Sequence, residues 1–322
     1  MRVLVTPTSL SADRDHAALV PLRDLGAELI FNDTGRPLTS GEVARALRGV
    51  DAVIAGLDDF DADALAAADR LRLIARYGAG VDNVDLDAAR VRGVAVTRTA
   101  GANAAAVAEM AIALAFAAAR GIPVLDAGVR AGEWPRGRGI ELGGRTFGVL
   151  GFGAIGRHVA ALARGLGMRV SAWDPLVSDA EIDSAGVLPR TLDDLCATSA
   201  VVSVHVPLVP ETRHLLDTAR LALLPRGAIV INTARGGILD EAAARDALDA
   251  GALHAVAVDV YESEPPSASP LVGHPRVVST PHSAGHTVEA VTRMAEGSVA
   301  AVVALARGEE PAGLVTVLPA PR

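Results

Sequence analysis

The segment Thr146-Phe-Gly-Val-Leu-Gly-Phe-Gly-Ala-Ile-Gly156 decides the fold of this chain. A short apolar run, Phe147 to Leu150, leads into glycines 151, 153 and 156 and then into an apolar helical pattern. In such a strand–turn–helix unit, Gly151 permits a tight turn and Gly153 lets backbone N–H groups approach a pyrophosphate. Gly156 lets the helix pack closely on the strand, and the N-terminus of the helix adds unpaired N–H donors. The segment therefore predicts a dinucleotide-binding unit.

An acidic residue after the next strand supports this interpretation. The apolar run Met168 to Trp173 ends in Asp174, which lies 23 residues after Gly151. An acid about 20 residues beyond the first glycine binds the ribose hydroxyls of a dinucleotide. The alternative, an ordinary strand–helix turn, gives no reason for an acid at this spacing. A carboxylate here would also repel a 2′-phosphate, so we expect NAD and not NADP as the cofactor.

Length, charge and cysteine usage narrow the class of protein. A chain of 322 residues is expected to form about two domains. Its net charge of −8 and its isoelectric point near 5.5 argue against nucleic acid or an anionic membrane as a partner. Cys196 is the only cysteine, which excludes an intrachain disulfide and a cysteine-based metal cluster and fits a reducing cytoplasm. We see no metal-ligand cluster and expect no metal. Met1 to Thr6 is expected to be a strand and not a signal peptide.

Residues 100–119 are almost entirely apolar and long enough to cross a membrane, but Glu109 lies in the middle of the segment. A carboxylate at mid-bilayer is costly. We therefore expect a buried helix over 103–119. Because apolar residues occur all the way round it, the helix should also contact a second subunit. The sequence predicts a homodimer whose interface includes Met110, Ile112, Leu114 and Phe116 or their neighbours.

Strands and helices alternate along most of the chain. The expected strands are at 2–5, 28–31, 52–55, 71–75, 94–96, 168–173, 201–206, 228–233, 255–260 and 276–280. The expected helices are at 13–25, 39–49, 61–68, 85–92, 178–184, 191–197, 217–224, 240–250 and 287–307. Repeated βα units of this kind form parallel sheets that are covered by helices on both faces. After the helix over 103–119, the glycine-rich segment around Trp134 is expected to be a loop.

The sequence predicts an α/β protein with two doubly wound parallel-sheet domains. Since the dinucleotide motif begins near residue 146, the N-terminal α/β unit needs a separate role, which is substrate binding. We expect a flavodoxin-like substrate domain over 1–98 and 287–322. A Rossmann NAD-binding domain over 99–286 is inserted in it. Ligands bind beyond the carboxyl ends of the strands in such sheets, so the residues directly after each strand are the candidates for a site.

Two charged residues near strand ends have alternative interpretations. Arg235 follows a buried strand and is flanked by glycine, so it could bind a carboxylate bidentately or be a surface arginine in a turn. Asp259 lies inside the apolar run Ala255 to Val260, where a carboxylate needs a partner. That partner is either the carboxamide of a nicotinamide or the local backbone, and the sequence does not separate the two.

A histidine follows the last expected strand, in the run Thr280-Pro-His282-Ser. Histidine suits proton transfer near neutral pH, and a carboxylate beside it would fix its tautomer and stabilise the charged ring. Glu264 is the natural candidate because it ends the preceding strand connection. His286 is expected to begin the last helix.

In these motifs the chain resembles the D-isomer-specific 2-hydroxyacid dehydrogenases, in particular the phosphoglycerate dehydrogenase-like branch. The resemblance covers nearly the whole chain. Its marks are Gly78-Ala-Gly80-Val-Asp-Asn83, Asn103 through Glu109, Gly144 to Gly156, His205-Val-Pro207, Asn232-Thr-Ala-Arg235-Gly-Gly, Asp259 to Glu264-Pro and Thr280-Pro-His282.

The resemblance implies a role for each of these segments. It implies that Arg235, Glu264 and His282 are catalytic and that the backbone of Ala79 and Gly80 binds the substrate carboxylate together with Arg235. The implied cofactor contacts are Gly151, Gly153, Ala154, Ile155, Gly156, Asp174, His205, Pro207, Thr233, Ala234 and Asp259. The family often has serine or threonine where Ala79 and Ala106 stand, so some polar contacts are missing.

The expected function is hydride transfer between NAD(H) and a small D-2-hydroxy acid or 2-oxo acid, such as phosphoglycerate, glyoxylate or hydroxypyruvate. The alternative is an NAD-sensing protein similar to the C-terminal-binding corepressors, which share the fold and the motifs. Arg76, Tyr77, Arg136 and Arg138 are candidate specificity residues, and extra arginines would suit a phosphorylated acid. We expect a cytoplasmic enzyme.

Overall fold

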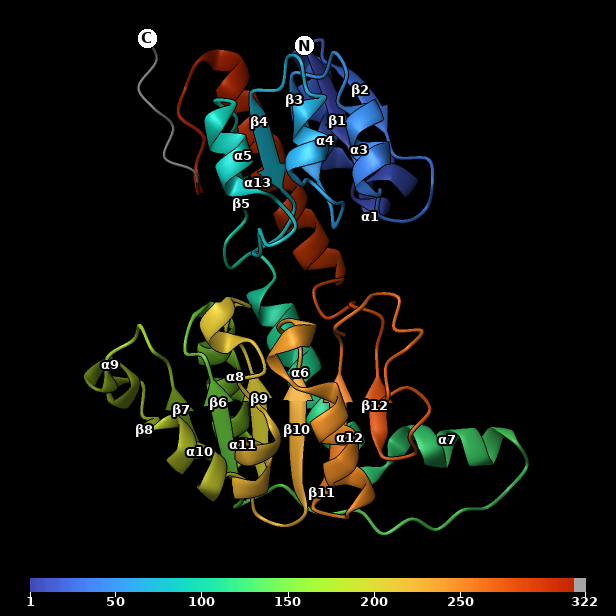
Figure 1. Cartoon of the computed structure of the whole chain (residues 1–322), viewed down its shortest axis with the longest axis vertical. Coiled ribbons are helices and arrows are strands. Elements are labelled where there is room, and N and C mark those ends of the chain that lie inside the picture. Colours follow the sequence, from blue (N-terminus) through green and yellow to red (C-terminus); the bar gives the residue numbers. More distant parts are fainter. Residues whose placement is uncertain (316–322) are drawn as a thin grey trace. The chain divides into compact units, whose positions relative to one another are not determined.

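The computed structural model describes residues 1–315, and the chain divides into two compact units (Figure 1). The first unit comprises Met1–Asn103 together with the segment from His286 onward, and the second comprises Ala104–Gly285. The prediction had put these divisions at 98/99 and 286/287. That one unit binds substrate and the other cofactor stays a prediction. The last seven residues of the predicted substrate domain, 316–322, lie outside the described residues.

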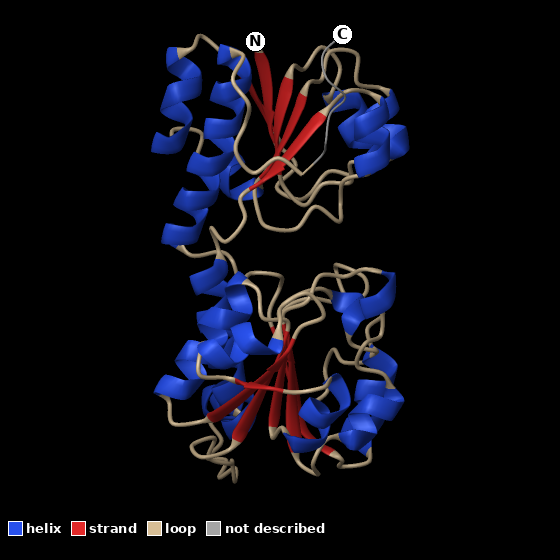
Figure 2. Ribbon diagram, turned by 90° about the vertical axis from the view of Figure 1, so that its left-hand side faces the viewer, coloured by secondary structure: helices blue, strands red, loops and turns tan. Residues whose placement is uncertain are grey.

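The first unit is built on a five-stranded parallel sheet with the order β2-β1-β3-β4-β5. This is the flavodoxin-like order, in which the direction of strand addition across the sheet reverses between β1 and β3. Helices cover both faces of the sheet (Figure 2). The strands are β1 Arg2–Val5, β2 Glu28–Phe31, β3 Ala52–Ala55, β4 Leu73–Arg76 and β5 Ala95–Arg98. The helices are α1 Thr8–Ala12, α2 Val20–Asp24, α3 Ser40–Ala46, α4 Ala62–Ala66, α5 Leu86–Val91 and α13 Val288–Arg307, with the 3₁₀ helix η1 at Ala17–Leu19.

The helix predicted over 13–25 is divided in the structure. A separate helix, α1, precedes it, η1 covers 17–19, and α2 begins only at Val20. Pro21 stands in the first turn of α2, where its missing N–H costs nothing, whereas the same proline inside a longer helix would break it. His16 begins η1 by accepting a hydrogen bond from the Ala18 N–H at its Nδ1 (3.2 Å).

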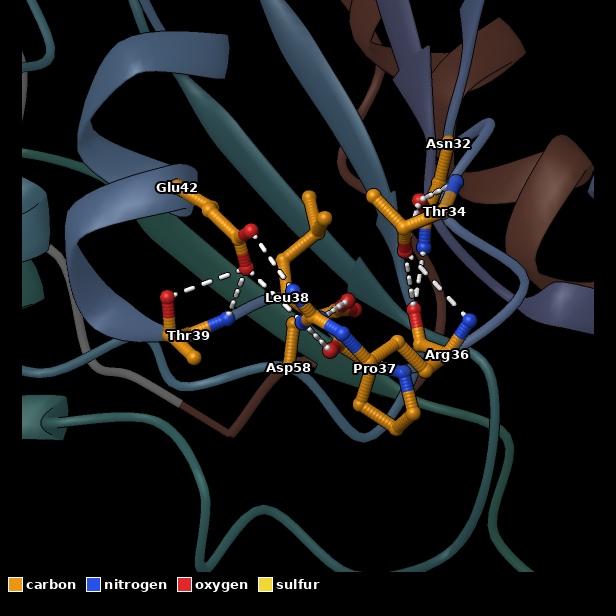
Figure 3. A network of polar contacts seen from close by, with 8 residues as sticks. All are labelled: Asn32, Thr34, Arg36, Pro37, Leu38, Thr39, Glu42 and Asp58. Atoms are coloured by element: carbon orange, nitrogen blue, oxygen red, sulfur yellow. Dashed lines mark hydrogen bonds and ion pairs between the residues drawn. The ribbon is translucent and has the colours of Figure 1, made fainter.

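A polar network ties the loop after β2 to the loop after β3 (Figure 3). Arg36 and Glu42 form a two-pronged ion pair at 2.8 and 2.9 Å, and Glu42 also accepts the backbone N–H of Thr39 (2.9 Å). The Arg36 guanidinium and the Thr39 donors hold the pKa of Glu42 at about 2. The backbone N–H of Leu38, the residue before Thr39, donates to the buried carboxylate of Asp58 (2.8 Å). Asp58 is thereby fixed at the carboxyl edge of this sheet.

The second unit is built on a seven-stranded parallel sheet with the order β12-β11-β10-β9-β6-β7-β8. Its strand order reverses between β6 and β9, as in dinucleotide-binding sheets. The strands are β6 Thr146–Leu150, β7 Arg169–Trp173, β8 Leu188–Pro189, β9 Val201–Val204, β10 Ala228–Asn232, β11 Leu253–Val258 and β12 Val277–Ser279. The helices are α6 Ala104–Arg120, α7 Ile122–Arg130, α8 Ala154–Gly165, α9 Asp179–Ser184, α10 Leu192–Thr198, α11 Thr218–Leu223 and α12 Glu241–Asp249, with 3₁₀ helices η2 Pro210–Thr212 and η3 Gly236–Ile238. The sequence did not predict the two-residue strand β8.

Helix α6 packs inside the second unit against α8, β10 and β11. Leu114 is buried there, so the prediction that it lies in a subunit interface is wrong. Met110, Ile112 and Phe116 are partly buried and pack on the same core.

Helix α7 occupies part of a segment that was not predicted to be helical. Gly121, in the left-handed conformation, separates it from α6, and Pro123 stands in its first turn. None of its residues is buried, and Ile122, Val124 and Val129 are each at least half exposed.

Over residues 1–315, no single helix has both the length and the apolar composition to cross a membrane. Taken together, α6 and α7 do meet that test, but the pair is bent by 66°.

Candidate active site

The glycine motif forms the turn between β6 and α8. Gly151 has φ of 100°, and a Cβ there would lie 2.6 Å from the backbone of His205. A Cβ on Gly156 would lie only 1.9 Å from the carbonyl oxygen of Gly151. Around Gly153, by contrast, nothing lies within 4 Å of a Cβ position, and no side chain caps α8. At Gly151 and Gly156 the backbone therefore lies too close to neighbouring backbone atoms for a side chain to fit. The N-terminus of α8, which begins with the backbone of Ala154 and Ile155, is open.

Asp174 stands at the carboxyl end of β7, beside this turn. One carboxylate oxygen accepts the Phe152 N–H (2.7 Å), and the other accepts the N–H groups of Leu176 (2.8 Å) and Val177 (3.2 Å). A carboxylate has about four acceptor positions, so these bonds orient Asp174 and leave it able to accept a ribose hydroxyl.

Unpartnered polar atoms lie at the ends of the neighbouring strands. The hydroxyl of Thr233, after β10, and Nδ1 of His205, after β9, are buried without a hydrogen-bond partner. Burial lowers the pKa of His205 to about 3, so its ring is neutral near pH 7, and Nε2 lies 2.8 Å from the Ser203 hydroxyl. Buried polar atoms normally have partners, so these two fit a polar ligand along this edge. Pro207 is exposed there, and Ala234 is half-buried.

Arg235 lies in the loop between β10 and α12, and Asn232, the last residue of β10, holds that loop. The Asn232 amide donates to the carbonyl oxygen of Arg235 (2.8 Å) and accepts the N–H of Ala234 (3.1 Å). The guanidinium of Arg235 donates to the carbonyl of Ala234 (2.7 Å). Asn232 is buried at the end of an apolar strand, a position at which the sequence could have marked it as a positioning residue.

His282 and Glu264 meet at the same edge of the sheet. His282 Nδ1 lies 2.8 Å from Glu264 Oε2, and Glu264 Oε1 accepts the N–H of Tyr261 (3.1 Å). Burial raises the pKa of Glu264. The hydrogen bond and charge of His282, the Tyr261 N–H and the charge of Arg235 outweigh that effect, so the pKa lies below its ordinary value. Glu264 is therefore ionised near neutral pH and can stabilise a charged imidazole.

Asp259 uses both carboxylate oxygens on the loop that carries His282. Oδ1 accepts the Thr280 hydroxyl (2.5 Å) and the Ser283 N–H (2.9 Å), and Oδ2 accepts the Ala284 N–H (2.8 Å). Of the two partners that the sequence left open, the structure shows local hydrogen bonds, and a nicotinamide contact stays a prediction.

The predicted substrate loop lies in the first unit. Arg76 is buried, and its guanidinium donates to the carbonyls of Ala55 (3.2 Å) and Tyr77 (2.5 Å) and to Asn83 Oδ1 (3.1 Å). These bonds hold the loop on which Ala79 and Gly80 stand. Arg76 thus has a structural role that the sequence did not suggest.

The other candidate specificity residues differ in exposure. Tyr77 is buried, and its hydroxyl lies 3.3 Å from both the Ser9 hydroxyl and the Val291 carbonyl oxygen. His286 precedes α13, which begins at Val288 with Thr287 as its cap. Arg136 and Arg138 are exposed.

Known proteins resemble this chain both in sequence and in structure. Residues 112–284 match the family of D-isomer specific 2-hydroxyacid dehydrogenases over its NAD-binding domain. The chain is 38% identical over 278 residues to the D-3-phosphoglycerate dehydrogenase of Methanocaldococcus jannaschii, covering 84% of this chain and 53% of that protein. The TT0316 protein of Thermus thermophilus superposes with a TM-score of 0.85 at 36% identity, covering 98% of this chain and 100% of that structure.

A third comparison concerns a structure with bound ligands. The D-lactate dehydrogenase of Aquifex aeolicus, solved with NAD and lactic acid, has a TM-score of 0.84 at 26% identity and covers 98% of this chain and 100% of that structure. The chain spans about half the length of the curated relatives that it matches. With its glycine turn, its two sheet orders and a match of this extent, the chain belongs to the D-isomer specific 2-hydroxyacid dehydrogenase family and carries that family's NAD-binding domain.

Proposed function

We propose that this protein is an NAD-dependent oxidoreductase that transfers a hydride between NAD(H) and a small D-2-hydroxy acid or 2-oxo acid. The observation that carries the proposal is the 2.8 Å contact between His282 and an ionised Glu264, at the edge of a dinucleotide-binding sheet. The alternative, an NAD-sensing corepressor-like protein, gains no support from the relatives described above.

His282 is proposed as the acid–base residue. Because Nδ1 faces Glu264, Nε2 is the nitrogen that meets the substrate oxygen. In oxidation Nε2 takes the hydroxyl proton, and in reduction the protonated ring returns a proton to the carbonyl oxygen. Glu264 stabilises the charged ring. Arg235 is proposed to hold the substrate carboxylate and to polarise the carbonyl.

NAD(H), when bound, supplies or accepts the hydride. We propose that Gly151, Gly153, Ala154, Ile155 and Gly156 hold its pyrophosphate and that Asp174 holds a ribose. The rest of the cofactor would be lined by His205, Pro207, Thr233, Ala234 and Asp259. The two buried atoms without partners, His205 Nδ1 and Thr233 Oγ1, support this arrangement.

We propose further that the substrate carries no phosphate. Ala79 and Gly80 would bind its carboxylate, and the neighbouring loop after β3 is acidic. Burial raises the pKa of Asp59 and the charges of Asp61 and Asp58 raise it further, as expected where carboxylates crowd together. The Arg76 guanidinium beside this loop bonds to backbone carbonyls and Asn83. A phosphate dianion would be repelled here.

A panel of 2-oxo acids with NADH tests both proposals. We expect glyoxylate or hydroxypyruvate to be reduced with a higher kcat/KM than 3-phosphohydroxypyruvate, and Asp59→Asn to narrow that difference. A preference for the phosphorylated acid would overturn the substrate class alone. Failure to reduce any acid of the panel would overturn the proposed activity.

We propose that the protein is a homodimer and that it is cytoplasmic. The exposed apolar residues of α7, together with Trp134 at 78% exposure, support a self-association surface there. A two-fold contact between copies would cover it, and cyclic dimers are the commonest closed assemblies.

The single cysteine, Cys196, is buried, and burial raises its pKa to about 11. An unreactive free thiol is compatible with a reducing compartment.

A further inference from the structure

Glu241, at the first position of α12, is one of the buried charged residues of the second unit and lies outside the motifs discussed above. Both of its carboxylate oxygens bond to the loop that carries Glu264. Oε1 accepts the N–H of Glu262 (2.7 Å), and Oε2 accepts the hydroxyl of Ser269 (2.5 Å). These two contacts lie on either side of Glu264 in the sequence, so one side chain holds the loop both before and after Glu264.

The peptide between Tyr261 and Glu262 is held from a second side by the Arg235 loop. A Cβ on Gly236 would lie 1.9 Å from the Tyr261 carbonyl carbon and 2.4 Å from the Glu262 nitrogen. The backbone after Arg235 therefore packs directly on the peptide whose N–H Glu241 accepts. Tyr261, on the other side of this peptide, donates its own N–H to Glu264 Oε1 (3.1 Å).

We infer that Glu241 is a positioning residue that sets the Tyr261–Glu262 peptide and so aims Glu264 at His282. The inference rests on the proposed function for its catalytic meaning, but the contact that it concerns is structural. A displacement of about 1 Å at a catalytic group costs on the order of 100-fold in rate. The acid–base pair therefore depends on a glutamate that touches neither of its members.

The direct test is an NMR titration of the His282 ring in the full chain. The signal is assigned with His282→Gln, and the reference is Glu264→Gln, in which the loss of the neighbouring carboxylate moves the titration midpoint toward lower pH. Glu241→Ala is expected to move the midpoint in the same direction, by at least half as much. Glu241→Gln keeps a carbonyl oxygen for the Glu262 N–H and should stay near the wild-type midpoint.

Controls separate positioning from general stability. Glu289→Ala removes an exposed glutamate from the first turn of α13 and should leave the midpoint unchanged. If Glu241→Ala does not fold, Ser269→Ala removes one of the two loop contacts and should give a smaller shift in the same direction. A wild-type midpoint in Glu241→Ala, or in Ser269→Ala where that variant replaces it, overturns the inference. So does an equal shift in Glu241→Gln and Glu241→Ala.

Activity provides the second measurement. Glu241→Ala should lower kcat by about 10-fold or more with little change in KM for NADH, and Glu241→Gln should recover most of the loss. An unchanged kcat in Glu241→Ala would also overturn the inference. Because the NMR midpoint needs no turnover, an inactive wild-type protein would refute the proposed activity and still leave the position of Glu264 measurable.

Discussion

His282 combines a strained backbone with a fixed ring. Its φ of 51° lies in the left-handed region, which is costly for a residue with a Cβ. Such a conformation persists only where neighbouring groups impose it. Here the N–H of His282 donates to the carbonyl of Asp259 (2.8 Å), and Glu264 holds the ring. The backbone and the ring of His282 are thus fixed by different acidic residues.

Replacement of His282 tests its proposed role. His282→Ala should lower turnover by ~100-fold or more, because general acid–base catalysis contributes about this much. NADH binding, measured by fluorescence titration, should stay near normal. His158, exposed on α8, provides the matched control, and His158→Ala should retain wild-type turnover. Wild-type turnover in His282→Ala would place the proton donor elsewhere.

Asp174 should determine the choice between the two nicotinamide cofactors. Wild-type protein is expected to use NADH far better than NADPH, because the carboxylate accepts ribose hydroxyls and repels a 2′-phosphate. Asp174→Ala should narrow the ratio of the two kcat/KM values. Equal efficiency of the wild-type protein with both cofactors would contradict this assignment.

The lowered pKa of Glu264 makes a prediction about stability. A carboxyl group with a lower pKa in the folded state stabilises the fold above its unfolded pKa, ordinarily 4.5, and loses that effect as the pH falls through the folded value. The difference in Tm between wild type and Glu264→Gln should therefore be present at about pH 5 to 6 and shrink below about pH 4.5. Thermal melts across this range check it, and a gap that widens below about pH 4.5 would contradict the assignment.

At the scale of the element, the two ends of α8 give a matched pair of glycine substitutions. Gly156→Ala should destabilise the fold by roughly 1–3 kcal/mol, because its Cβ would meet the Gly151 carbonyl at 1.9 Å. Gly165→Ala meets nothing within 4 Å and should stabilise by about 0.5–1 kcal/mol through helix propensity. Urea denaturation compares the two. Equal stability of both variants would argue against the tight packing of this turn.

Residue patterns predicted most strands, because buried parallel strands are short apolar runs bounded by glycine or polar residues. They were less reliable for the short helices. Pro21 divides a segment that was predicted to be one amphipathic helix, and Gly121 and Pro123 begin α7 in a segment for which no helix was predicted. The proline in the first turn of α7 was a usable signal for it.

At the scale of the whole molecule, assembly is the main prediction. Light scattering during size-exclusion chromatography at micromolar concentration should give twice the 32.9 kDa mass of the chain. Val129→Glu on α7 should lower that mass toward one chain, since it places a charge on an exposed apolar surface, whereas Val91→Glu on the exposed side of α5 should not. A wild-type mass near 32.9 kDa would refute the dimer.

The placement of Arg235 and His282 was predictable because each lies just after a strand. Glu264 was chosen because it ends the preceding strand connection, and it lies beside His282. The catalytic roles of the three residues stay predictions. Glu241 was not predicted, because a glutamate in the first turn of a helix ordinarily stabilises the helix dipole, and only three-dimensional contacts show its link to the loop at 262–269. Arg76 was taken as a candidate specificity residue, since sequence does not reveal which carbonyls surround an arginine.

The inserted arrangement of the two units has a mechanical consequence. The first unit contains the N-terminus and all of the chain from His286 onward, while the second is the unbroken stretch Ala104–Gly285. A tensile load applied to the two chain ends therefore passes through the first unit. While that unit stays folded, it carries the load between Asn103 and His286. The second unit should come under tension only after the first has been pulled apart, so single-molecule stretching should record the two ruptures in that order.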